Sequence, residues 1–297
     1  MPTVSSQTPG ATRLSAIERS DGIGRIVIEA DRLDSTNRRL VELGRAGAAH
    51  GTILIARDQT AGRGKGERGW FSTADGSLCL SVLVRTGRGL REAAQLPLLA
   101  AVALREAILA ATGVEAGVKW PNDLLAGGRK ICGILAEAAC DGEGDLDFVV
   151  IGMGLNLAIP DAAFPAELRD RAVSLATLAG RPVDRGAFVA TFAAVLDRWV
   201  GLWERHGLSA FAATWTDHAL HLGQVVRLDD GDEEICATLI GLAGDGALRI
   251  RDAAGTVRDV HSGEIHSGDI HSGEIGTAPP VAPIPSHLHK THMGAFS

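Results

Sequence analysis

The stretch VKWPNDLLAGGRKICGILAEA, residues 118–138, decides the fold of this chain, because it reads as short strands connected by tight turns. Apolar runs at 118–120, 124–126 and 131–138 are bounded by turn residues, as strands usually are. The two adjacent glycines in LAGGRKI predict a hairpin. The apolar run LDFVVIGMGLNL at 146–157 follows, so the middle of the chain predicts several strands of a sheet.

Outward from this stretch, strands and helices follow one another irregularly. Further strands are predicted by the β-branched or alternating runs at 26–30, 52–56 and 77–84. Helices are predicted after Ser35, a candidate N-cap, and over 91–111, 184–206 and 208–215, with Pro97 marking a kink or a start. Because no regular β–α–β repeat is present, the pattern favours an α+β fold with a mixed β-sheet layered with helices.

The two ends of the chain differ from the middle. Residues 1–22 are rich in Ser, Thr, Gly and Pro, which predicts a flexible arm. After residue 218, short strands alternate with Gly and Asp turns and predict a small β-barrel. The five-residue repeat HSGEI HSGDI HSGEI then occupies 261–275, before a Pro-rich and His-rich tail.

Length and composition exclude several classes of protein. The chain has 297 residues, enough for about two domains with real cores. Its net charge of -7, from 29 basic and 36 acidic residues, argues against a surface that is mostly a nucleic-acid footprint. The sequence has no signal-peptide pattern and no long uncharged apolar window. We therefore expect a cytoplasmic protein with no DNA or membrane partner. Its four cysteines, which include no CxxC pair, are expected to be reduced and buried.

The segment DQTAGRGKGERGW, residues 58–70, carries the strongest chemical signal. Its glycines match the GxGxxG pattern of dinucleotide-binding folds, but a turn and a strand follow instead of the required helix. A P-loop is excluded because Lys65 is followed by glycine and not by Ser or Thr. What remains is a glycine-rich loop with three cations, Arg63, Lys65 and Arg68, which suits a polyphosphate. The alternative is a solvated surface loop, against which the large apolar ring of Trp70 argues.

A second group of polar residues surrounds the predicted hairpin. Pro121 stiffens a strand end, so that Lys119, Asn122 and Asp123 project from a fixed backbone. The hairpin returns Lys130 to the same neighbourhood, where a partly enclosed cation needs an anionic partner. The alternative is a hairpin with ordinary exposed charges.

A third signal lies in IGMGLNL, residues 151–157, where two glycines and Asn156 interrupt an apolar strand. Glycine inside a strand marks the close approach of a ligand or another backbone, or simply tight packing. This run therefore supports a binding site only when it is considered together with the glycine-rich loop and the polar residues around the hairpin.

Taken in order, five strings of the sequence resemble the signature of biotin protein ligases. They are DSTN at 34–37, QTAGRGKGERGW at 59–70, KWPND at 119–123, KICGIL at 130–135 and GMGLNL at 152–157. The resemblance covers about residues 25–260 and implies a class II synthetase-like catalytic domain followed by an SH3-like barrel. It implies that biotin is adenylated with ATP and Mg²⁺, and is passed through biotinyl-5′-AMP to a lysine of a biotin carboxyl carrier domain.

The resemblance also implies a domain division. The expected parts are an arm at 1–22, a catalytic domain that binds biotin and ATP at 23–217, an SH3-like domain at 218–265 and a repeat-bearing, disordered tail at 266–297. The sequence contains no winged-helix domain like that of the ligases that double as repressors. We therefore expect the monofunctional type, as a monomer or a weak homodimer.

The roles of individual residues follow from the same resemblance. The expected catalytic residues are Lys130, Arg63 and Asp123. The expected biotin-binding residues are Ser35, Thr36, Asn37, Gln59, Gly62, Arg63, Lys130 and Gly133. The expected ATP and adenylate contacts are Arg63, Lys65, Arg68, Trp70, Lys119, Asn122 and Asn156. Mg²⁺ is expected to arrive with ATP, because the sequence suggests no all-protein metal cage.

Each half-reaction has its own electrostatic requirement. The carboxylate of biotin is already ionised at neutral pH, so adenylation needs cations where two anions meet. An acceptor lysine with a pKa of about 10.4 is almost fully protonated at pH 7, and a nearby carboxylate can receive it. Asp123 is the candidate for that carboxylate. Its other possible role is to order Lys119 or the magnesium ion.

Departures and rival functions qualify this reading. The loop reads GRGK with Glu67, where the family usually has GRGR and a glycine. Glu67 adds a negative charge beside the phosphates.

The alternative functions are a lipoate ligase or octanoyltransferase of the same superfamily, a biotin-responsive repressor and a catalytically silent binding module. The histidine repeat favours either metal binding or duplication of the barrel's last turn and strand. We favour duplication, in which one copy completes the barrel.

Overall fold

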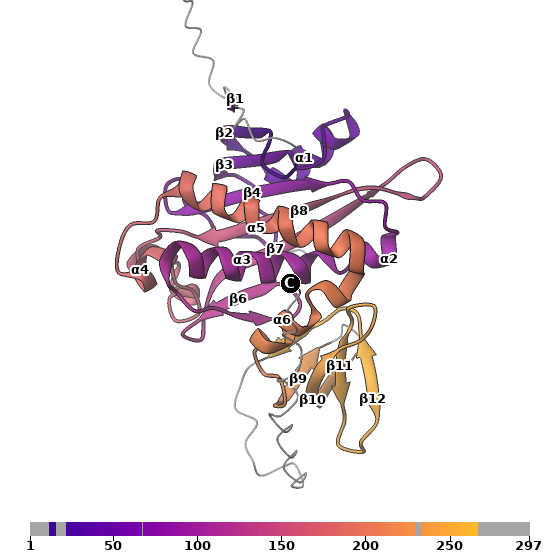
Figure 1. The fold of residues 1–297 in the computed structure, drawn as a ribbon. Helices are drawn as coiled ribbons and strands as arrows, with labels where there is room; N and C mark the ends of the chain where they lie inside the picture. The colour runs from indigo at the N-terminus through magenta and orange to yellow at the C-terminus, as the bar shows by residue number, and fades with distance from the viewer. Residues whose placement is uncertain (1–11, 16–21, 67, 230–232, 267–297) are drawn as a thin grey trace, which may run out of the picture.

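Two β-sheets organise the part of the chain that the computed structural model describes, residues 12–15, 22–66, 68–229 and 233–266 (Figure 1). The larger sheet has the order β1-β2-β3-β4-β8-β7-β6-β5. Its strands are β1 (Thr12–Ser15), β2 (Val27–Leu33), β3 (Ile53–Gln59), β4 (Ser77–Val84), β5 (Gly117–Lys119), β6 (Asp123–Ala126), β7 (Arg129–Cys140) and β8 (Leu146–Asn156). Strands β2 and β3 are parallel and the other neighbours are antiparallel, so the predicted mixed sheet is confirmed.

Helices accompany the larger sheet. They are α1 (Thr36–Arg45), α2 (Leu90–Ala93), α3 (Leu96–Thr112), α4 (Leu175–Ala179), α5 (Arg185–His206) and α6 (Ala212–His218), with 3₁₀ turns at Asp161–Ala163, Ala166–Leu168 and Gly207–Ala210. Helix α3 begins with Pro97 in its first turn, as predicted, because a proline there gives up no helical hydrogen bond. Helix α5 begins after Asp184, whose carboxylate accepts a hydrogen bond from the Ala187 amide at 2.6 Å.

The period of two along the central strands separates the two faces of the larger sheet. Leu80, Val82 and Ile151 belong to the main core together with residues of α3 and α5, which lie across that face (Figure 1). The residues between them in the strands, such as Ser81 and Gly152, face the other way. The opposite face therefore carries glycines and polar groups in the middle of the sheet, and the candidate site lies there.

Two helical stretches, Leu90–Thr112 and Arg185–Ala210, are long and apolar enough to cross a membrane by length and composition alone. Residues of both belong to the main hydrophobic core. Burial in a core selects the same apolar composition as a membrane does, so packing against the sheet accounts for it.

The predicted hairpin joins β6 to β7. Its two glycines, Gly127 and Gly128, have φ of 56° and 75°, a left-handed conformation that favours glycine at both central positions of a two-residue hairpin turn. The turn sets Ala126 opposite Arg129 and returns β7 along β6.

The smaller sheet is antiparallel, with the order β12-β11-β10-β9-β13. Its strands are β9 (Val225–Asp229), β10 (Glu234–Leu242), β11 (Leu248–Arg251), β12 (Val257–Val260) and β13 (Glu264–His266). The first repeat supplies β13, where Ile265 is buried opposite Leu228 of β9. One copy of the repeat completes this sheet, as predicted. His266, which begins the second copy, is the last described residue, and the rest of the repeats and the tail to residue 297 lie outside the described residues.

Two expectations need correction. The arm predicted over 1–22 contains β1, which pairs antiparallel with β2. That prediction is wrong for these four residues, because an open sheet edge can bind any extended segment regardless of its composition. The remaining residues up to 21 lie outside the described part. The cysteines are all free, but only Cys79 and Cys132 are buried, whereas Cys140 and Cys236 are exposed.

Candidate active site

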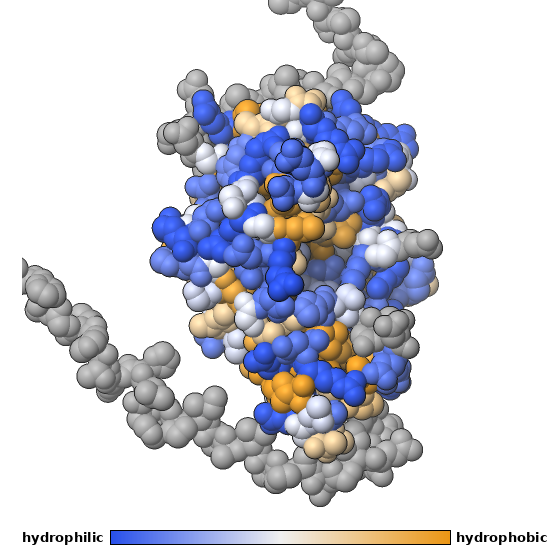
Figure 2. Space-filling view, turned by 90° about the vertical axis from the view of Figure 1, so that its right-hand side faces the viewer, coloured by the Kyte–Doolittle hydropathy of each residue, from blue (hydrophilic) through white to orange (hydrophobic). Residues whose placement is uncertain are grey.

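A cavity of about 630 Å³ opens on the face of the larger sheet opposite α3 and α5. Its lining comes from loop residues 63–65 and 68–71, the β6–β7 hairpin, the segment around residues 164–172 and β13. Figure 2, which views the molecule from the right-hand side of Figure 1, shows a hollow at mid-height with hydrophobic surface inside it and hydrophilic residues around it. The volume falls in the usual range for a small-molecule site.

All but one of the site residues predicted from sequence line this cavity. They are Ser35, Thr36, Asn37, Gln59, Arg63, Lys65, Arg68, Trp70, Lys119, Asn122, Asp123, Lys130, Gly133 and Asn156. Gly62 is the exception. It is absent from the lining, and its carbonyl accepts a hydrogen bond from the backbone N–H of Trp70 at 2.9 Å. Glu67 lies outside the described residues.

A polar cluster forms one end of the cavity. The Oε1 of Gln59 accepts the backbone N–H of Thr36 at 2.8 Å and lies 3.1 Å from the Thr36 hydroxyl. Ser35 stands at the N-cap of α1, as predicted, but its side chain makes no capping hydrogen bond. Its hydroxyl is therefore not committed to the helix and is available to a ligand at the wall of the cavity.

Asn37 is held within this wall by partners from two strands. Its amide nitrogen donates to the Leu135 carbonyl at 3.0 Å and to Glu137 Oε2 at 2.8 Å. A Cβ at Gly152 would lie 2.0 Å from Asn37 Oδ1. Only glycine therefore fits beneath Asn37 on β8, which explains the first glycine of the GMGLNL string.

The second glycine of that string makes room for Trp70. Gly154 of β8 pairs with Gly133 of β7. A Cβ would lie 2.4 Å from the indole at Gly154 and 3.1 Å from it at Gly133. The indole N–H is buried and has no hydrogen-bond partner among the described residues. The Lys130 ammonium lies 5.5 Å from the ring centroid, within the range of a cation–π contact.

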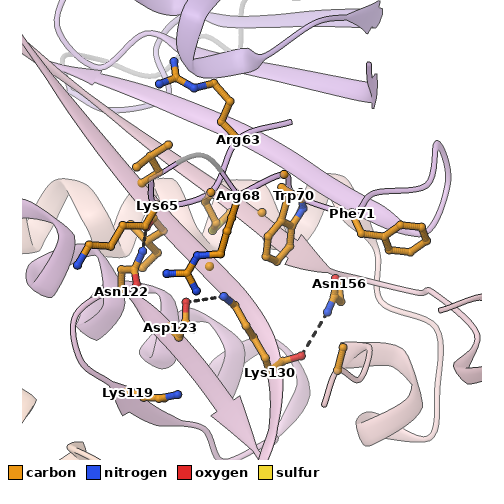
Figure 3. A pocket seen from close by; sticks show the side chains of 18 of the residues that line it. Arg63, Lys65, Arg68, Trp70, Phe71, Lys119, Asn122, Asp123, Lys130 and Asn156 are labelled. Carbon is orange, nitrogen blue, oxygen red and sulfur yellow. Dashed lines mark hydrogen bonds and ion pairs between the residues drawn. The ribbon is translucent and has the colours of Figure 1, made fainter. Parts of the chain in front are cut away.

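The predicted anionic partner of Lys130 is Asp123. The two form an ion pair with 2.7 Å between Nζ and Oδ1 (Figure 3). Their positions follow from the hairpin, because β6 begins at Asp123 and β7 carries Lys130 back beside it. Lys119 is paired with Asp123 in the β5–β6 register, so the expected convergence of two lysines, an amide and a carboxylate is confirmed.

The cations of the glycine-rich loop reach three different partners. Lys65 donates to the Gly263 carbonyl at 2.8 Å, and Arg68 pairs with Glu264 at 2.8 Å. These two contacts join the loop to the first repeat and β13. Arg63 pairs with Glu137 at 3.0 Å, and Figure 3 shows its side chain pointing away from Lys130. In this structure Arg63 therefore does not reach the place expected for the junction of carboxylate and phosphate.

Burial shapes the electrostatics of the site. It lowers the pKa of Lys65, helped by the neighbouring charge of Arg68, and also lowers the pKa of Lys119. The hydrogen bond from Arg68 lowers the pKa of Glu264. Partly desolvated cations that share a cavity are stabilised by an incoming anion. The arrangement therefore suits a ligand with several negative charges.

Asn122 and Asn156 donate hydrogen bonds to backbone carbonyls around the β6–β7 hairpin. Asn122 donates to the Ile134 carbonyl at 2.7 Å. Asn156 is buried and donates to the carbonyls of Lys130 and Val173 at 3.2 and 3.3 Å. Both side chains hold β7 in place, and their oxygens remain for a ligand. The described residues contain no group of three or more His, Cys, Asp or Glu that could hold a metal ion.

Sequence reasoning missed several residues of the site. Glu137 is absent from the cavity lining but bonds Asn37 and Arg63, which line it; its place on the same face of β7 as Gly133 could have been found from the period of two. Glu264 lies in the first repeat, which was interpreted from sequence as a metal-binding or duplicated segment and not as part of this cavity. Phe164 and Arg171 come from an irregular segment between β8 and α4, and nothing in their local sequence indicated that they face the cavity.

Comparison with known proteins places this architecture in a family. The model of the biotin/lipoate A/B protein ligase family matches residues 29–156, and that of the biotin protein ligase C-terminal domain matches residues 221–266. A biotin–acetyl-CoA-carboxylase ligase from Paracoccus denitrificans is 34% identical over 227 residues, which cover 75% of this chain and 93% of the relative. The chain belongs to the biotin protein ligase family.

Further relatives agree with this family. A bifunctional ligase/repressor from Bacillus spizizenii is 31% identical, over 83% of this chain and 75% of that protein. The biotin protein ligase from Aquifex aeolicus in complex with biotin and ATP superposes with a TM-score of 0.70 at 28% identity, covering 81% of this chain and 97% of the other. The predicted fold, a biotin-ligase catalytic domain followed by the family's C-terminal domain, is confirmed.

Proposed function

We propose that this ligase joins biotin to a specific lysine of a biotin carboxyl carrier domain, with ATP as the energy source and biotinyl-5′-AMP as the intermediate. The observation that carries the proposal is one cavity lined by two chemically different groups of residues, which we call its polar end and its cationic end. One end presents the polar groups of Ser35, Thr36 and Gln59. The other gathers Lys65, Lys119 and Lys130.

The polar end suits the ring system of biotin. A cyclic urea offers both N–H donors and a carbonyl acceptor, and the hydroxyl and amide groups of this end can bond to both. The apolar wall and Trp70 extend from there toward Lys130, which suits an aliphatic chain ending in a carboxylate.

The cationic end serves the first half-reaction. The biotin carboxylate attacks the α-phosphate of ATP and pyrophosphate leaves, so negative charge accumulates between the two reactants. Lys130 is the cation for that junction, while Lys65, Arg68 and Lys119 take the phosphates. Mg²⁺ comes with ATP, whose phosphate oxygens are its usual ligands.

The second half-reaction requires a change of partners at Asp123. When Lys130 turns to the anionic adenylate, the Asp123 carboxylate becomes free to receive the ammonium of the carrier lysine. That ammonium gives a proton to the Asp123 carboxylate, the resulting amine attacks the acyl carbon, and AMP leaves. This sequence gives Asp123 the acceptor-lysine role and explains why it pairs with Lys130 in the free protein.

A lipoate ligase is the second candidate, because one family model spans both activities. The polar end argues against it. A dithiolane ring makes no strong hydrogen bonds and would leave the buried groups of Thr36 and Gln59 without ligand partners, which is unfavourable. The names of the Paracoccus relative and of the Aquifex structure also favour biotin.

Pyrophosphate release with biotin or with lipoate tests the proposal. We expect release with ATP and biotin, and at least about a hundredfold less with lipoate. Release without a preference for biotin would contradict it.

A cytoplasmic location and a monomeric or weakly dimeric state complete the proposal. Size-exclusion chromatography tests the oligomeric state.

A further inference from the structure

Ser81 lies directly behind the polar end of the cavity, in the middle of β4. Its side chain is buried and it is absent from the cavity lining. Its Oγ lies 2.7 Å from Thr36 Oγ1 and 2.6 Å from Asn37 Oδ1. Both neighbours line the cavity, so Ser81 contacts the wall from the protein side.

Counting protons fixes the direction of these hydrogen bonds. Asn37 uses its amide N–H groups on two acceptors, the Leu135 carbonyl and a Glu137 carboxylate oxygen. Its Oδ1 therefore faces Ser81 and can only accept. The single hydroxyl proton of Ser81 must go to Asn37, since two oxygens 2.6 Å apart need a proton between them.

The proton of Thr36 is then committed as well. The Ser81 oxygen has only lone pairs left for Thr36, and the other near neighbour of the Thr36 hydroxyl is the acceptor Oε1 of Gln59. Either way the Thr36 proton stays inside the protein. Toward the cavity, Thr36 can present only lone pairs, which accept a hydrogen bond. Gln59, whose Oε1 is occupied by Thr36, keeps its Nε2 protons for other partners.

We propose that Ser81 is a positioning residue that sets the hydrogen-bond polarity of the biotin-binding wall, so that Thr36 accepts and Gln59 donates. This pattern complements an N–H group beside a carbonyl, as in a cyclic urea. The proposal rests on the proposed function, in which the polar end takes the ring of biotin. Ser81 acts only through Thr36 and Asn37 and does not touch the substrate.

The sheet geometry makes this position special. Ser81 is paired with Gly152 across β4 and β8, and the missing side chain of Gly152 is the space into which Asn37 Oδ1 fits. The hydroxyl of Ser81 on β4 and the missing side chain of Gly152 on β8 thus together form the contact surface, or seat, that holds the Asn37 side chain. Alanine at 81 would leave Asn37 Oδ1 buried without its donor and would leave the Thr36 proton free to turn.

The test compares Ser81→Ala with Ser77→Ala. Ser77 is the matched control, because it lies four residues earlier on the same face of β4, is equally buried and bonds the Thr73 amide instead of the wall. Calorimetry measures the dissociation constants for biotin and, separately, for ATP. Thermal unfolding reports stability. Ser81→Cys, which keeps the size with a weaker donor, replaces the alanine variant if that variant does not fold.

We expect Ser81→Ala to weaken biotin binding about tenfold, which corresponds to one buried hydrogen-bonding group left unpaired. ATP binding should change less than about twofold, and the preference for biotin over octanoate should fall by the same factor as biotin affinity. Ser77→Ala should keep wild-type affinity for biotin. Desthiobiotin, which retains the urea, should lose as much affinity as biotin.

Two results would overturn the inference. One is biotin affinity in Ser81→Ala equal to that of Ser77→Ala. The other is an equal loss for biotin and octanoate, which would indicate a general disturbance of the cavity. Thr36→Val separates this inference from the proposed function. If Thr36→Val weakens biotin binding and Ser81→Ala does not, only the role of Ser81 fails. If Thr36→Val leaves biotin binding unchanged, the ring does not bind at this end, and the assignment of the polar end fails too.

Discussion

At the residue scale, the pair formed by Lys130 and Asp123 is the chemical centre of the site. The two side chains come from adjacent strands and lie 2.7 Å apart. One is a cation that a substrate carboxylate and phosphate can attract. The other is the carboxylate that is released when this happens. The two half-reactions should therefore respond differently to the loss of each residue.

Lys130→Ala is expected to slow adenylation by at least about a hundredfold, because removing one preorganised charge from a reaction site has an effect of that size. Pyrophosphate release with biotin and ATP measures it. Arg129→Ala is the matched control, since Arg129 is the preceding residue and pairs with Asp161 at 3.5 Å at the surface. Wild-type release by Lys130→Ala would remove the residue from the mechanism.

Asp123→Asn is expected to affect transfer to the carrier far more than adenylation. The amide cannot receive the carrier's ammonium, and we expect a loss of about a hundredfold in transfer against less than about tenfold in adenylation. Single-turnover experiments on each half-reaction measure the two numbers. Equal losses would instead assign Asp123 to ordering Lys119, Lys130 or the metal.

At the element scale, two contacts join the glycine-rich loop to β13 and the residue before it. Lys65 donates to the Gly263 carbonyl, and Arg68 forms an ion pair with Glu264. Glu264→Gln removes the charge that holds Arg68, so amide exchange of residues 62–66 is expected to become a few times faster in the free protein. Glu274→Gln, the same position in the third repeat, is the control and should leave exchange unchanged. Hydrogen-exchange mass spectrometry measures both variants.

Adenylate formation should slow amide exchange of the glycine-rich loop in the wild type. Unchanged exchange there would contradict the prediction that this loop closes over the adenylate.

The same ion pair predicts a pH dependence. The pKa of Glu264 is lowered in the folded protein by the hydrogen bond from Arg68. Its contribution to stability is therefore present above the ordinary value of 4.5 and is lost as the pH falls through the lowered value. Because the pair is partly exposed, we expect the wild type to exceed Glu264→Gln by at most about 1 kcal/mol at pH 7. Denaturation curves from pH 7 down to 3 should show this difference shrink as the pH falls below 4.5. A difference that stays constant over the whole range would contradict it.

At the scale of the whole molecule, the smaller sheet is part of the catalytic cavity. Residues 263–266 line it together with the catalytic domain. A chain that ends at residue 275 keeps β13 and is expected to ligate biotin as well as the full chain. A chain that ends at residue 260 loses β13 and its contacts to Lys65 and Arg68, and we expect at least a tenfold loss of activity. Transfer of biotin to a carrier domain measures both. Loss of activity in the longer truncation would show that the later repeats have a function.

The sequence alone determined most of the fold and the membership of the site. Strand period, the paired glycines of the hairpin and the proline at the start of α3 all act through local backbone preferences, which a reader of the sequence can apply directly. The ordered strings supplied every residue that was predicted for the site, and of these only Gly62 fell outside the cavity lining. Short-range rules are sufficient for these features because the responsible residues are neighbours in the chain.

Only the tertiary structure decided which groups face one another. Arg63 pairs with Glu137, 74 residues away, and Lys65 bonds the carbonyl of Gly263, 198 residues away. The seat of Asn37 required Gly152 from a different strand. A charged group or a hydroxyl interacts with the polar groups that lie within a few ångströms of it. Which groups lie that close depends on how strands distant in the sequence, and the two sheets, pack together. No spacing along the sequence contains this information, so the partners, the polarity of the binding wall and the part of the first repeat in the site became visible only in three dimensions.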